Sequence, residues 1–232
     1  MSRVYAISNQ KGGVGKTTTA VNLGSALAMQ DQRVLVVDLD PQGNASSGLG
    51  HHKALVEQGI AEVLLGLALM PDILRPTPVD GLHLAPASPA LVGLEVELVE
   101  VARREHRLKD ALTLVAHDYD FVLLDCPPAL NPDLERTGIV LTMVDGRTNL
   151  GQDVAAQARQ VFGGEVFEAT VPRNVRLGEA PSFGQPIHLY APGSRGAQAY
   201  HELADEVLVR AGLRTAAPAP AASARRKKKE AS

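Results

Sequence analysis

The 232-residue sequence predicts an α/β protein with a mostly parallel β-sheet flanked by helices. Short apolar, β-branched runs alternate along the chain with segments of helical periodicity, which is typical of βαβ units. A glycine-rich stretch connects the first of these runs to the first helical segment. Because 45% of the residues are hydrophobic, the chain can bury a sizeable core, and one domain is expected rather than two.

Six segments are predicted to form strands, because each is a short apolar run bounded by turn-forming residues. They extend over residues 3–9, 33–40, 82–88, 120–128, 138–145 and 165–173. Helices are expected between them, and the sequence contains no internal repeat at a fixed period.

The clearest helical pattern extends over residues 91–116, where apolar side chains recur at steps of three and four residues and form one stripe. We expect one continuous structural helix there, packed on the sheet. A last helix is expected over about residues 196–211. Its inward face would carry Tyr200, Leu203, Val207 and Leu208.

Composition excludes several classes of protein. No apolar run approaches the roughly 18 residues of a membrane-spanning helix, and the first residues lack a signal-peptide pattern, so a cytoplasmic protein is expected. The single cysteine, Cys126, cannot form an internal disulfide or a multi-cysteine metal site within one chain. We expect it to be a buried core thiol.

The end of the chain differs in charge from the rest. Residues 224–232 contain five of the 23 Lys and Arg residues but one of the 26 acidic residues, which leaves the rest at a net charge of −7. Because the preceding stretch is rich in Ala and Pro, we expect a folded domain over residues 1–214 and a disordered tail over residues 215–232. The tail is interpreted either as a solubility tail or as a polybasic arm that binds nucleic-acid phosphates.

The glycine-rich stretch KGGVGKTT, residues 11–18, is the strongest functional signal. At a strand-to-helix junction, its glycines let the backbone approach an anion, and the helix N-terminus attracts negative charge. Lys16 would neutralise the outer phosphates of a nucleotide, and the Thr17 hydroxyl would bind Mg²⁺. An ordinary phosphate-binding loop has a glycine in place of Gln10, and Lys11 adds a second lysine that needs an explanation.

These eight residues resemble the deviant Walker A motif of the ParA/MinD family of ATPases, with Lys11 in the place of the signature lysine. Residues 36–44, VVDLDPQGN, are similar to the family's switch I, and residues 121–128, FVLLDCPP, resemble its Walker B and switch II segments. TMVDGRTNLG and VPRNVRLGEAPSFGQPI are close to the chromosome- and plasmid-partitioning branch, the ParA or Soj type. The resemblance covers residues 3–210 and implies a P-loop NTPase fold.

The resemblance implies an enzyme that binds ATP with Mg²⁺ and hydrolyses it. In the family's ATP-bound sandwich dimer the signature lysine reaches the nucleotide of the other subunit, so Lys11 would act in trans, like an arginine finger. Lys16 would be the catalytic lysine in cis, and Asp40 matches the residue that positions the attacking water. The nucleotide-binding residues are expected to be Lys11, Gly12, Gly13, Val14, Gly15, Lys16, Thr17, Thr18, Pro172 and Asn174, the last two beside the adenine base.

Magnesium ligands are expected from Thr17, Asp38 and Asp125. Asp125 follows the apolar run FVLL, so a strand would place it at the carboxyl end of the sheet, where a hard oxygen ligand can lie near Mg²⁺. Asp38 lies two residues before Asp40 and shares its face of the strand, so it would support the magnesium shell. Each of these aspartates is also compatible with a plain strand-end role.

Arg147 and Arg176 match arginines with which partitioning ATPases bind DNA without sequence preference. A solvated or salt-bridged surface arginine is the alternative for each. Since only ten residues precede Lys11, no separate DNA-reading module is expected, and only phosphates would be bound. The adjacent His51 and His52 are interpreted as surface or supporting residues rather than metal ligands.

The leading hypothesis is a DNA-partitioning ATPase that forms a homodimer with ATP, binds DNA non-specifically and is stimulated by a centromere-binding partner of the ParB/Spo0J type. It would be cytoplasmic and nucleoid-associated, without membrane binding. One alternative is a MinD-like division-site regulator, which needs an apolar-faced C-terminal helix that the Arg/Lys-rich end does not offer. Another is an internally deleted nucleotide-binding relative with weak or no activity.

One part of the family pattern is missing between Pro128 and Gly138. The family places a further strand and flanking helices there, but residues 129–137 are too few for a parallel crossover, which needs about a dozen residues or more. The missing strand would lie next to the strand that precedes the phosphate-binding loop. Either the following strand takes its place, or a gap leaves apolar edges and backbone groups in need of another partner. We expect the Mg-ATP contacts to survive, with lower stability and turnover than in intact relatives.

Overall fold

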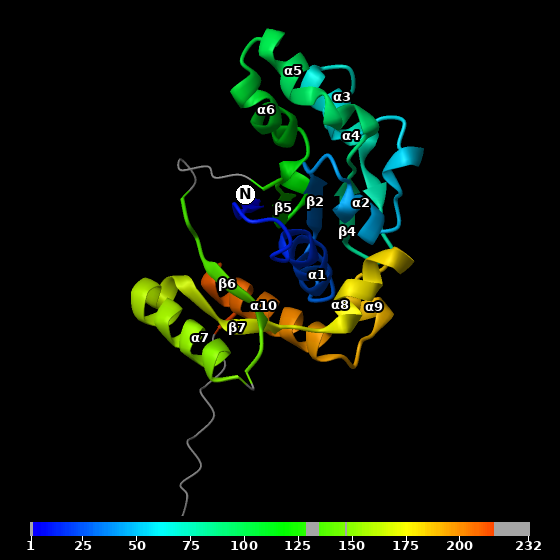
Figure 1. The fold of residues 1–232 in the computed structure, drawn as a ribbon. Helices are drawn as coiled ribbons and strands as arrows, with labels where there is room; N and C mark the ends of the chain where they lie inside the picture. The colour runs from blue at the N-terminus through cyan, green and yellow to red at the C-terminus, as the bar shows by residue number, and fades with distance from the viewer. Residues whose placement is uncertain (1, 129–134, 147, 216–232) are drawn as a thin grey trace, which may run out of the picture.

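A computed structural model describes residues 2–128, 135–146 and 148–215 of the chain. Its strands form two separate sheets, one of five strands and one of two (Figure 1). All six predicted strands are present, with slightly narrower bounds. Most of the predicted tail lies outside the described residues, so the boundary between residues 214 and 215 stays a prediction.

The larger sheet has the strand order β1-β5-β2-β4-β3 and is parallel except at β3. Its strands are β1 Arg3–Ile7, β2 Val34–Asp38, β3 Arg75–Pro76, β4 Leu82–Ala85 and β5 Phe121–Asp125. β2 and β5 are buried along their whole length, as expected for apolar runs that are covered on both faces. β1 is an edge strand, because β5 is its only partner among the described strands.

Two helices, α1 Lys16–Ala28 and α10 Arg195–Arg210, pack against each other. α1 contacts β2 and β5 of the larger sheet, and α10 contacts β7 Val166–Pro172 of the smaller one. Alternate residues of β2 enter the two cores: Val34 and Val36 pack in the core of α1 and α10, whereas Leu35 and Val37 pack in the core of α3 and α6. The remaining α-helices are α2 Asn44–Gly48, α3 Ile60–Leu65, α4 Met70–Ile73, α5 Leu94–Glu97, α6 Arg107–Thr113, α7 Asn149–Phe162, α8 Val175–Glu179 and α9 Ile187–Tyr190. Short 3₁₀ helices are η1 Lys53–Leu55, η2 Pro89–Val92, η3 Leu98–Glu100, η4 Arg104–His106, η5 Ala116–Asp118, η6 Gly163–Glu165 and η7 Ala180–Phe183.

The single helix predicted over residues 91–116 is wrong. The structure divides this segment into η2, α5, η3, η4 and α6, and Arg103 between them adopts a left-handed conformation with a φ of 55°. Residues 102–107 contain no large apolar side chain, so they have nothing to bury on a helical face and leave the helix. The apolar stripe itself is kept, since Leu94 and Leu112 are buried in the same core.

The predicted last helix is confirmed as α10, and its contact with α1 includes polar as well as apolar groups. Tyr200 of α10 is 1% exposed, and its hydroxyl lies 3.1 Å from the Thr19 hydroxyl of α1. Asn22 of α1 accepts a hydrogen bond from the Ile187 amide at 2.7 Å. α1 therefore joins the larger sheet to the C-terminal part of the chain.

The smaller sheet consists of β6 Ile139–Val144 and β7 Val166–Pro172, which run parallel. Among the described strands, neither pairs with a strand of the larger sheet. Of the two outcomes expected from the missing segment, the structure therefore shows the gap. A cavity of about 540 Å³, lined by β1, β6, α1 and α10, lies between the two sheets.

Tyr200→Phe is expected to lower the free energy of unfolding by about 1 kcal/mol, because the buried Thr19 hydroxyl loses its partner. Urea unfolding followed by circular dichroism measures the loss. Tyr190→Phe is the matched control, since its hydroxyl donates to Glu179 at a more exposed position and its removal should cost less. Equal losses in the two variants would contradict the importance of the contact between α1 and α10.

Candidate functional site

The predicted phosphate-binding loop connects the carboxyl end of β1 to the first turn of α1 (Figure 1). Gly13 and Gly15 have φ angles of 70° and 90°, which residues with a side chain rarely adopt. Gly15 is the N-cap of α1, and no side chain caps the helix there. The first amide groups of α1 are therefore available to an anion, as in other anion sites at helix N-termini.

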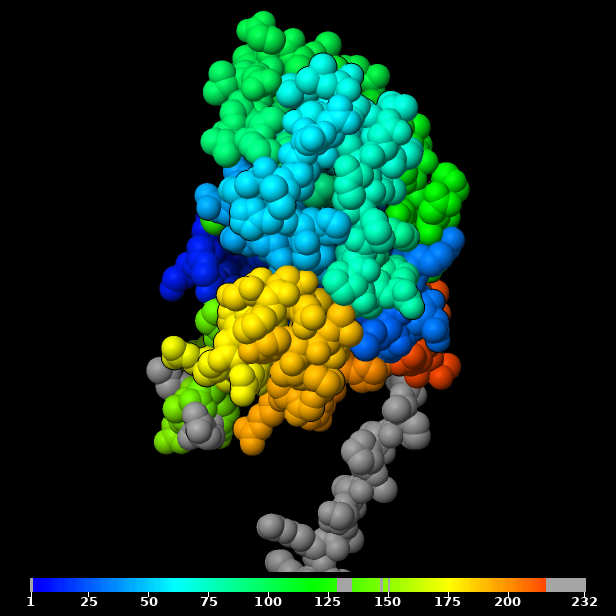
Figure 2. All heavy atoms as spheres, turned by 90° about the vertical axis from the view of Figure 1, so that its right-hand side faces the viewer, coloured from blue at the N-terminus to red at the C-terminus, as the bar shows by residue number. Residues whose placement is uncertain are grey.

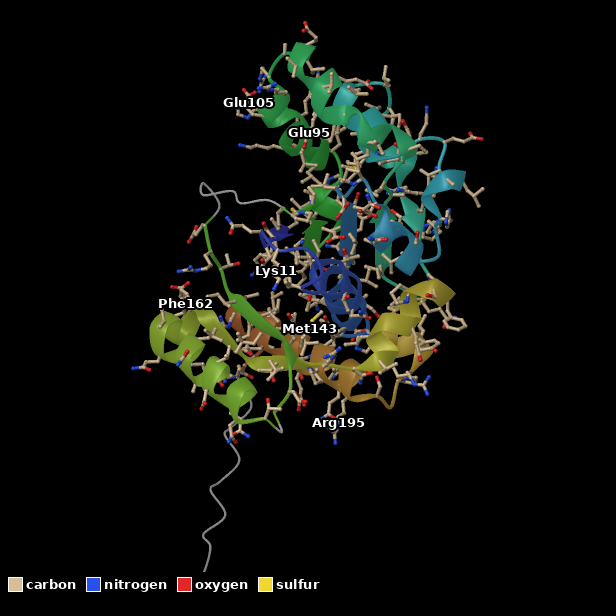
Figure 3. The ribbon with its side chains drawn as sticks, viewed as in Figure 1. Lys11, Glu95, Glu105, Met143, Phe162 and Arg195 are labelled. Atoms are coloured by element: carbon tan, nitrogen blue, oxygen red, sulfur yellow. The ribbon has the colours of Figure 1, made fainter. Side chains whose placement is uncertain are left out.

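The two lysines of this loop differ in burial. Lys16 is 9% exposed, and its ammonium group donates to the carbonyl oxygen of Lys11 at 3.3 Å. Lys11 itself is exposed, and its backbone amide donates to the Asn9 side chain at 2.9 Å. Figure 3 labels Lys11 beside the start of α1. The structure thus places Lys16 within the loop and Lys11 on the surface.

Two carboxylates meet at the carboxyl ends of β2 and β5. Asp38 and Asp125 are opposite each other in the strand register, and both are completely buried. Neither carboxylate oxygen of Asp125 has a hydrogen-bond partner among the described residues. Burial raises the pKa of Asp125 to about 7. The nearby Thr17 side chain lowers this pKa in part, although it is not close enough or not aligned well enough to count as a hydrogen-bond donor to the carboxylate. A buried carboxylate without partners fits a cation such as Mg²⁺, which prefers oxygen ligands.

Asp38 is bound to the loop that follows β2. Its carboxylate accepts hydrogen bonds from the amide and hydroxyl of Ser46, at 2.8 and 2.7 Å, and from the amide of Asp40 at 3.2 Å. Burial raises the pKa of Asp38, and the Ser46 hydrogen bonds counteract the rise. The Ser46 hydroxyl also accepts a hydrogen bond from the Ala87 amide at 3.0 Å. Asp38 therefore anchors the loop that carries Asp40.

Two residues at the site, Ser46 and Thr142, were not predicted from the sequence. Thr142 of β6 donates its hydroxyl hydrogen to the carbonyl oxygen of Val14 at 2.7 Å, which ties the smaller sheet to the phosphate-binding loop. Neither residue has a distinctive sequence signal, because serine in a short helix and threonine in a strand are both common. Only their tertiary contacts identify them.

Three further residues expected at the site lie at or just beyond the carboxyl ends of strands. Asp40 is half-buried, and its carboxylate accepts a hydrogen bond from the Gln42 amide at 2.9 Å. Pro172 ends β7, and Asn174 is the N-cap of α8, where its side-chain oxygen accepts from the Arg176 amide at 2.9 Å. Their roles in positioning water and binding the base remain predictions.

Of the two arginines expected to bind DNA, the structure describes only Arg176, and Arg147 lies outside the described residues. Arg176 is exposed on α8, a helix on the face that Figure 2 shows. Its guanidinium group pairs with Glu179 at 2.8 Å, and Glu179 also accepts a hydrogen bond from the Tyr190 hydroxyl at 2.9 Å. In this structure Arg176 is therefore a salt-bridged surface arginine, which was the alternative to a DNA-binding role. Its role in DNA binding stays a prediction.

The remaining candidate groups have structural roles. Cys126 is partly buried rather than fully buried, and burial raises the pKa of its thiol to about 11. His51 contacts the carbonyl oxygen of Pro76, and His52 accepts from the Ala54 amide. Within the described ranges, no group of three His, Cys, Asp or Glu side chains is arranged to hold a metal ion. None of the helices in the described part of the chain has the length and apolar composition to span a bilayer.

The free helix N-terminus, the left-handed glycines and the unsatisfied Asp125 define a phosphate-binding site of the P-loop NTPase class. Residues 2–142 match the sequence model of a family described as an AAA domain. The chain is 45% identical to the sporulation initiation inhibitor protein Soj of Bacillus subtilis, over 89% of this chain and 98% of that protein. It is also 45% identical to the chromosome-partitioning ATPase Soj of Thermus thermophilus, over 90% and 96%. The chain therefore belongs to the Soj/ParA family of chromosome-partitioning ATPases.

Solved structures with the same fold support this class. A cobyrinic acid a,c-diamide synthase from Mycobacterium smegmatis, with bound ATP analogue and magnesium, superposes with a TM-score of 0.77 at 33% identity, covering 91% of this chain and 96% of that one. The septum site-determining protein MinD from Pyrococcus horikoshii, complexed with Mg-ADP, has a TM-score of 0.76 at 27% identity, covering 92% and 98%. The predicted fold of helices around a mostly parallel sheet is confirmed.

The alignment with the Bacillus protein also indicates an internal deficit. It extends over 249 positions, whereas 89% of 232 residues is about 206, so about 43 positions have no residue of this chain. A segment missing from this chain is thus supported, and its place between Pro128 and Gly138 stays a prediction.

Asp125→Asn is expected to raise the free energy of unfolding of the nucleotide-free protein by at least about 1 kcal/mol at pH 8. The folded-state pKa of about 7 lies above the ordinary value of 3.8, so folding penalises the ionised carboxyl, and the penalty is complete only above pH 7. The gain should shrink as the pH falls from 7 to 4, because the carboxyl is then protonated in the folded protein and increasingly in the unfolded one. Urea unfolding between pH 4 and 8 measures it.

The matched control is Asp80→Asn, since Asp80 is exposed and its replacement should change stability little at any pH. The claim that burial destabilises the ionised Asp125 would be contradicted if Asp125→Asn were less stable than the parent at pH 8. A gain in stability that does not depend on pH would also contradict it.

Proposed function

We propose that this ATPase binds Mg-ATP at the loop site and acts in DNA partitioning. The observation that carries the proposal is the Asp125 carboxylate, which is buried without a partner close to Thr17 at the start of α1. Such a carboxylate is costly in the absence of a cation and is stabilised by one. Bound Mg²⁺ would supply positive charge against the phosphate oxygens during hydrolysis.

Different groups of the chain would bind the phosphates, hold the ion and position the attacking water. The first amides of α1 and the Lys16 ammonium group would bind the phosphates, while Thr17 and Asp125 would hold the ion. Asp38 holds the following loop through Ser46, so that Asp40 can orient the water that attacks the outer phosphate.

Lys11 is the loop residue best suited to act on a second subunit. It is exposed, whereas Lys16 is buried in the same loop. A cation that reaches the outer phosphate from a partner subunit would stabilise the charge that develops during phosphoryl transfer. Hydrolysis then depends on an ATP-bound homodimer, and loss of the outer phosphate loosens that dimer.

The dimer would bind DNA through its phosphates and respond to a centromere-binding protein of the ParB type. The names of the relatives, which include the chromosome partitioning protein ParA of Myxococcus xanthus at 42% identity, support the partitioning role. An exposed guanidinium such as that of Arg176 is suited to phosphates, provided its pair with Glu179 opens. Association with the nucleoid would follow from this binding.

The gap between the sheets favours one second candidate function. In an ordinary sheet, backbone pairing on both sides would hold β1 and the loop after it, but β1 is paired only with β5. On the other side, the Thr142 hydrogen bond to Val14 links β6 to the loop. The second candidate is therefore a nucleotide-binding relative that binds Mg-ATP but hydrolyses it slowly.

Lys16→Ala is expected to weaken ATP binding by about 10- to 100-fold, because the phosphates lose a charge-assisted contact inside the loop. Lys11→Ala should leave the affinity of the monomer within about threefold, since an exposed lysine contributes little in cis, but should abolish the ATP-dependent dimer. Calorimetric titration measures affinity, and light scattering after size exclusion measures the dimer.

Lys109→Ala is the matched control for both variants, because Lys109 is an exposed lysine on α6, away from the loop. The assignment of Lys11 is wrong if the Lys11→Ala variant dimerises with ATP as the parent does.

Arg176→Glu and Arg147→Glu are each expected to weaken ATP-dependent DNA binding equally for all sequences and to lower the salt slope by about 1 or more. Arg104→Glu, at an exposed position on η4, is the matched control, and deleting residues 224–232 should have a smaller effect than either arginine variant. Fluorescence anisotropy with labelled duplexes at several salt concentrations measures this. If only the tail deletion abolished binding, the polybasic tail would be the DNA-binding element.

A further inference from the structure

The edge of β1 that faces the gap carries backbone groups that pair with no strand in the described part of the chain. The Arg3 amide donates to the Asp120 carbonyl at 3.0 Å, and the Ile7 carbonyl accepts from the Cys126 amide at 3.4 Å, so the odd-numbered residues of β1 face β5. In a parallel pair, alternate residues point their N–H and C=O groups to opposite sides. Val4 and Ala6 therefore direct theirs into the gap, where no described strand pairs with them.

The opposite wall of the gap, β6, runs in the same direction as β1. At the start of the strands, the Arg3 guanidinium donates to the Ala211 carbonyl at 2.6 Å, and the neighbouring Arg210 donates to Val166, which pairs with the first residue of β6. Farther along, Thr142, the fourth residue of β6, donates to the carbonyl oxygen of Val14 in the loop that follows β1. The start of β1 is thus on the side of the cavity where β6 starts, and the loop after β1 contacts the later part of β6.

The floor of the gap has a buried apolar part, flanked by Thr19 of α1 and Arg210 of α10. Leu23 of α1 and Leu203 and Val207 of α10 line the cavity from below, and all three are buried in the core that α1 and α10 share. Tyr5 and Val140 of the two walls pack against the same core. Figure 1 shows α1 and α10 near the two sheets. α1 contacts β2 and β5, α10 contacts β7, and the two helices pack against each other below the gap.

The size of the gap suits a short peptide. At about 30 Å³ per water molecule, the cavity of about 540 Å³ corresponds to some 18 waters. One end of it is lined by Val14, Gly15 and Lys16 of the phosphate-binding loop, and the part between the two strands has room for a short stretch of extended chain. A small apolar molecule would cover the floor but leave the N–H and C=O groups of Val4 and Ala6 unpaired. An extended peptide satisfies both requirements.

We propose that the gap is a binding site for one β-strand of another chain. The strand runs parallel to β1 and β6, hydrogen-bonds to Val4 and Ala6, and directs every second side chain, which is apolar, onto the floor formed by α1 and α10. The opposite positions of the strand are polar. Its occupant is thus an extended peptide of about five residues, the length of β1, with alternating apolar and polar side chains.

The test uses the nucleotide-free full chain, so its result does not depend on ATP hydrolysis. The probe is a fluorescein-labelled peptide in which valine alternates with threonine between terminal lysines, and a peptide of the same composition with its valines adjacent is the control. We expect saturable binding with a Kd below about 100 µM for the alternating peptide only. At saturation, hydrogen exchange of the Val4 and Ala6 amides should slow by at least about tenfold.

Val140→Trp fills the gap from the β6 wall and should weaken peptide binding by at least about tenfold. The matched control is Val154→Trp, because Val154 is 53% exposed on α7 and does not line the cavity. Absence of saturable binding, equal binding of the control peptide, or saturation without slower exchange at Val4 and Ala6 would each overturn the proposal. If the Val140→Trp variant does not fold, hydrogen exchange of the parent chain still tests whether the peptide binds along β1.

Discussion

The packing of α10 against α1 holds the two sheets of this protein together. The described strands of the two sheets do not pair, so the usual backbone hydrogen bonds across a continuous sheet are missing at this point. Their place is taken by buried contacts between the two helices, including the hydrogen bond between Tyr200 and Thr19. Because α1 begins at the phosphate-binding loop, the same packing also fixes the site.

The site itself is arranged for charge that the folded chain does not neutralise. Burial disfavours the ionised form of Asp125, and the neighbouring Asp38 disfavours it further, while Ser46 satisfies Asp38. The ionised Asp125 therefore lowers the stability of the folded protein at neutral pH, and a cation bound at this point would restore it. The loop carries two positive charges: that of Lys11 lies on the surface, and that of Lys16 is buried.

Local sequence pattern predicted every described strand except the two-residue β3, together with α1, α10 and the phosphate-binding loop, because each depends on periodicity or on glycines at fixed spacing. The prediction of one continuous helix over residues 91–116 was wrong. The apolar periodicity on both sides of Arg103 is helical, but the polar stretch around Arg103 interrupts the helix. The roles of Ser46 and Thr142 were not predictable, because both depend on contacts between segments far apart in the chain. The length of residues 129–137 predicted a disturbed sheet, but only the structure shows that it becomes a gap.

The central claim is that the site binds Mg-ATP although the sheet beside it is interrupted. Thermal unfolding of the parent chain with a non-hydrolysable ATP analogue, in the presence of Mg²⁺ or of EDTA, tests it most directly. With the analogue at about 100 times its Kd, the account predicts a Tm about 5 °C higher or more with Mg²⁺, and a much smaller shift with EDTA. Identical Tm values with and without the analogue in the presence of Mg²⁺ would contradict the account.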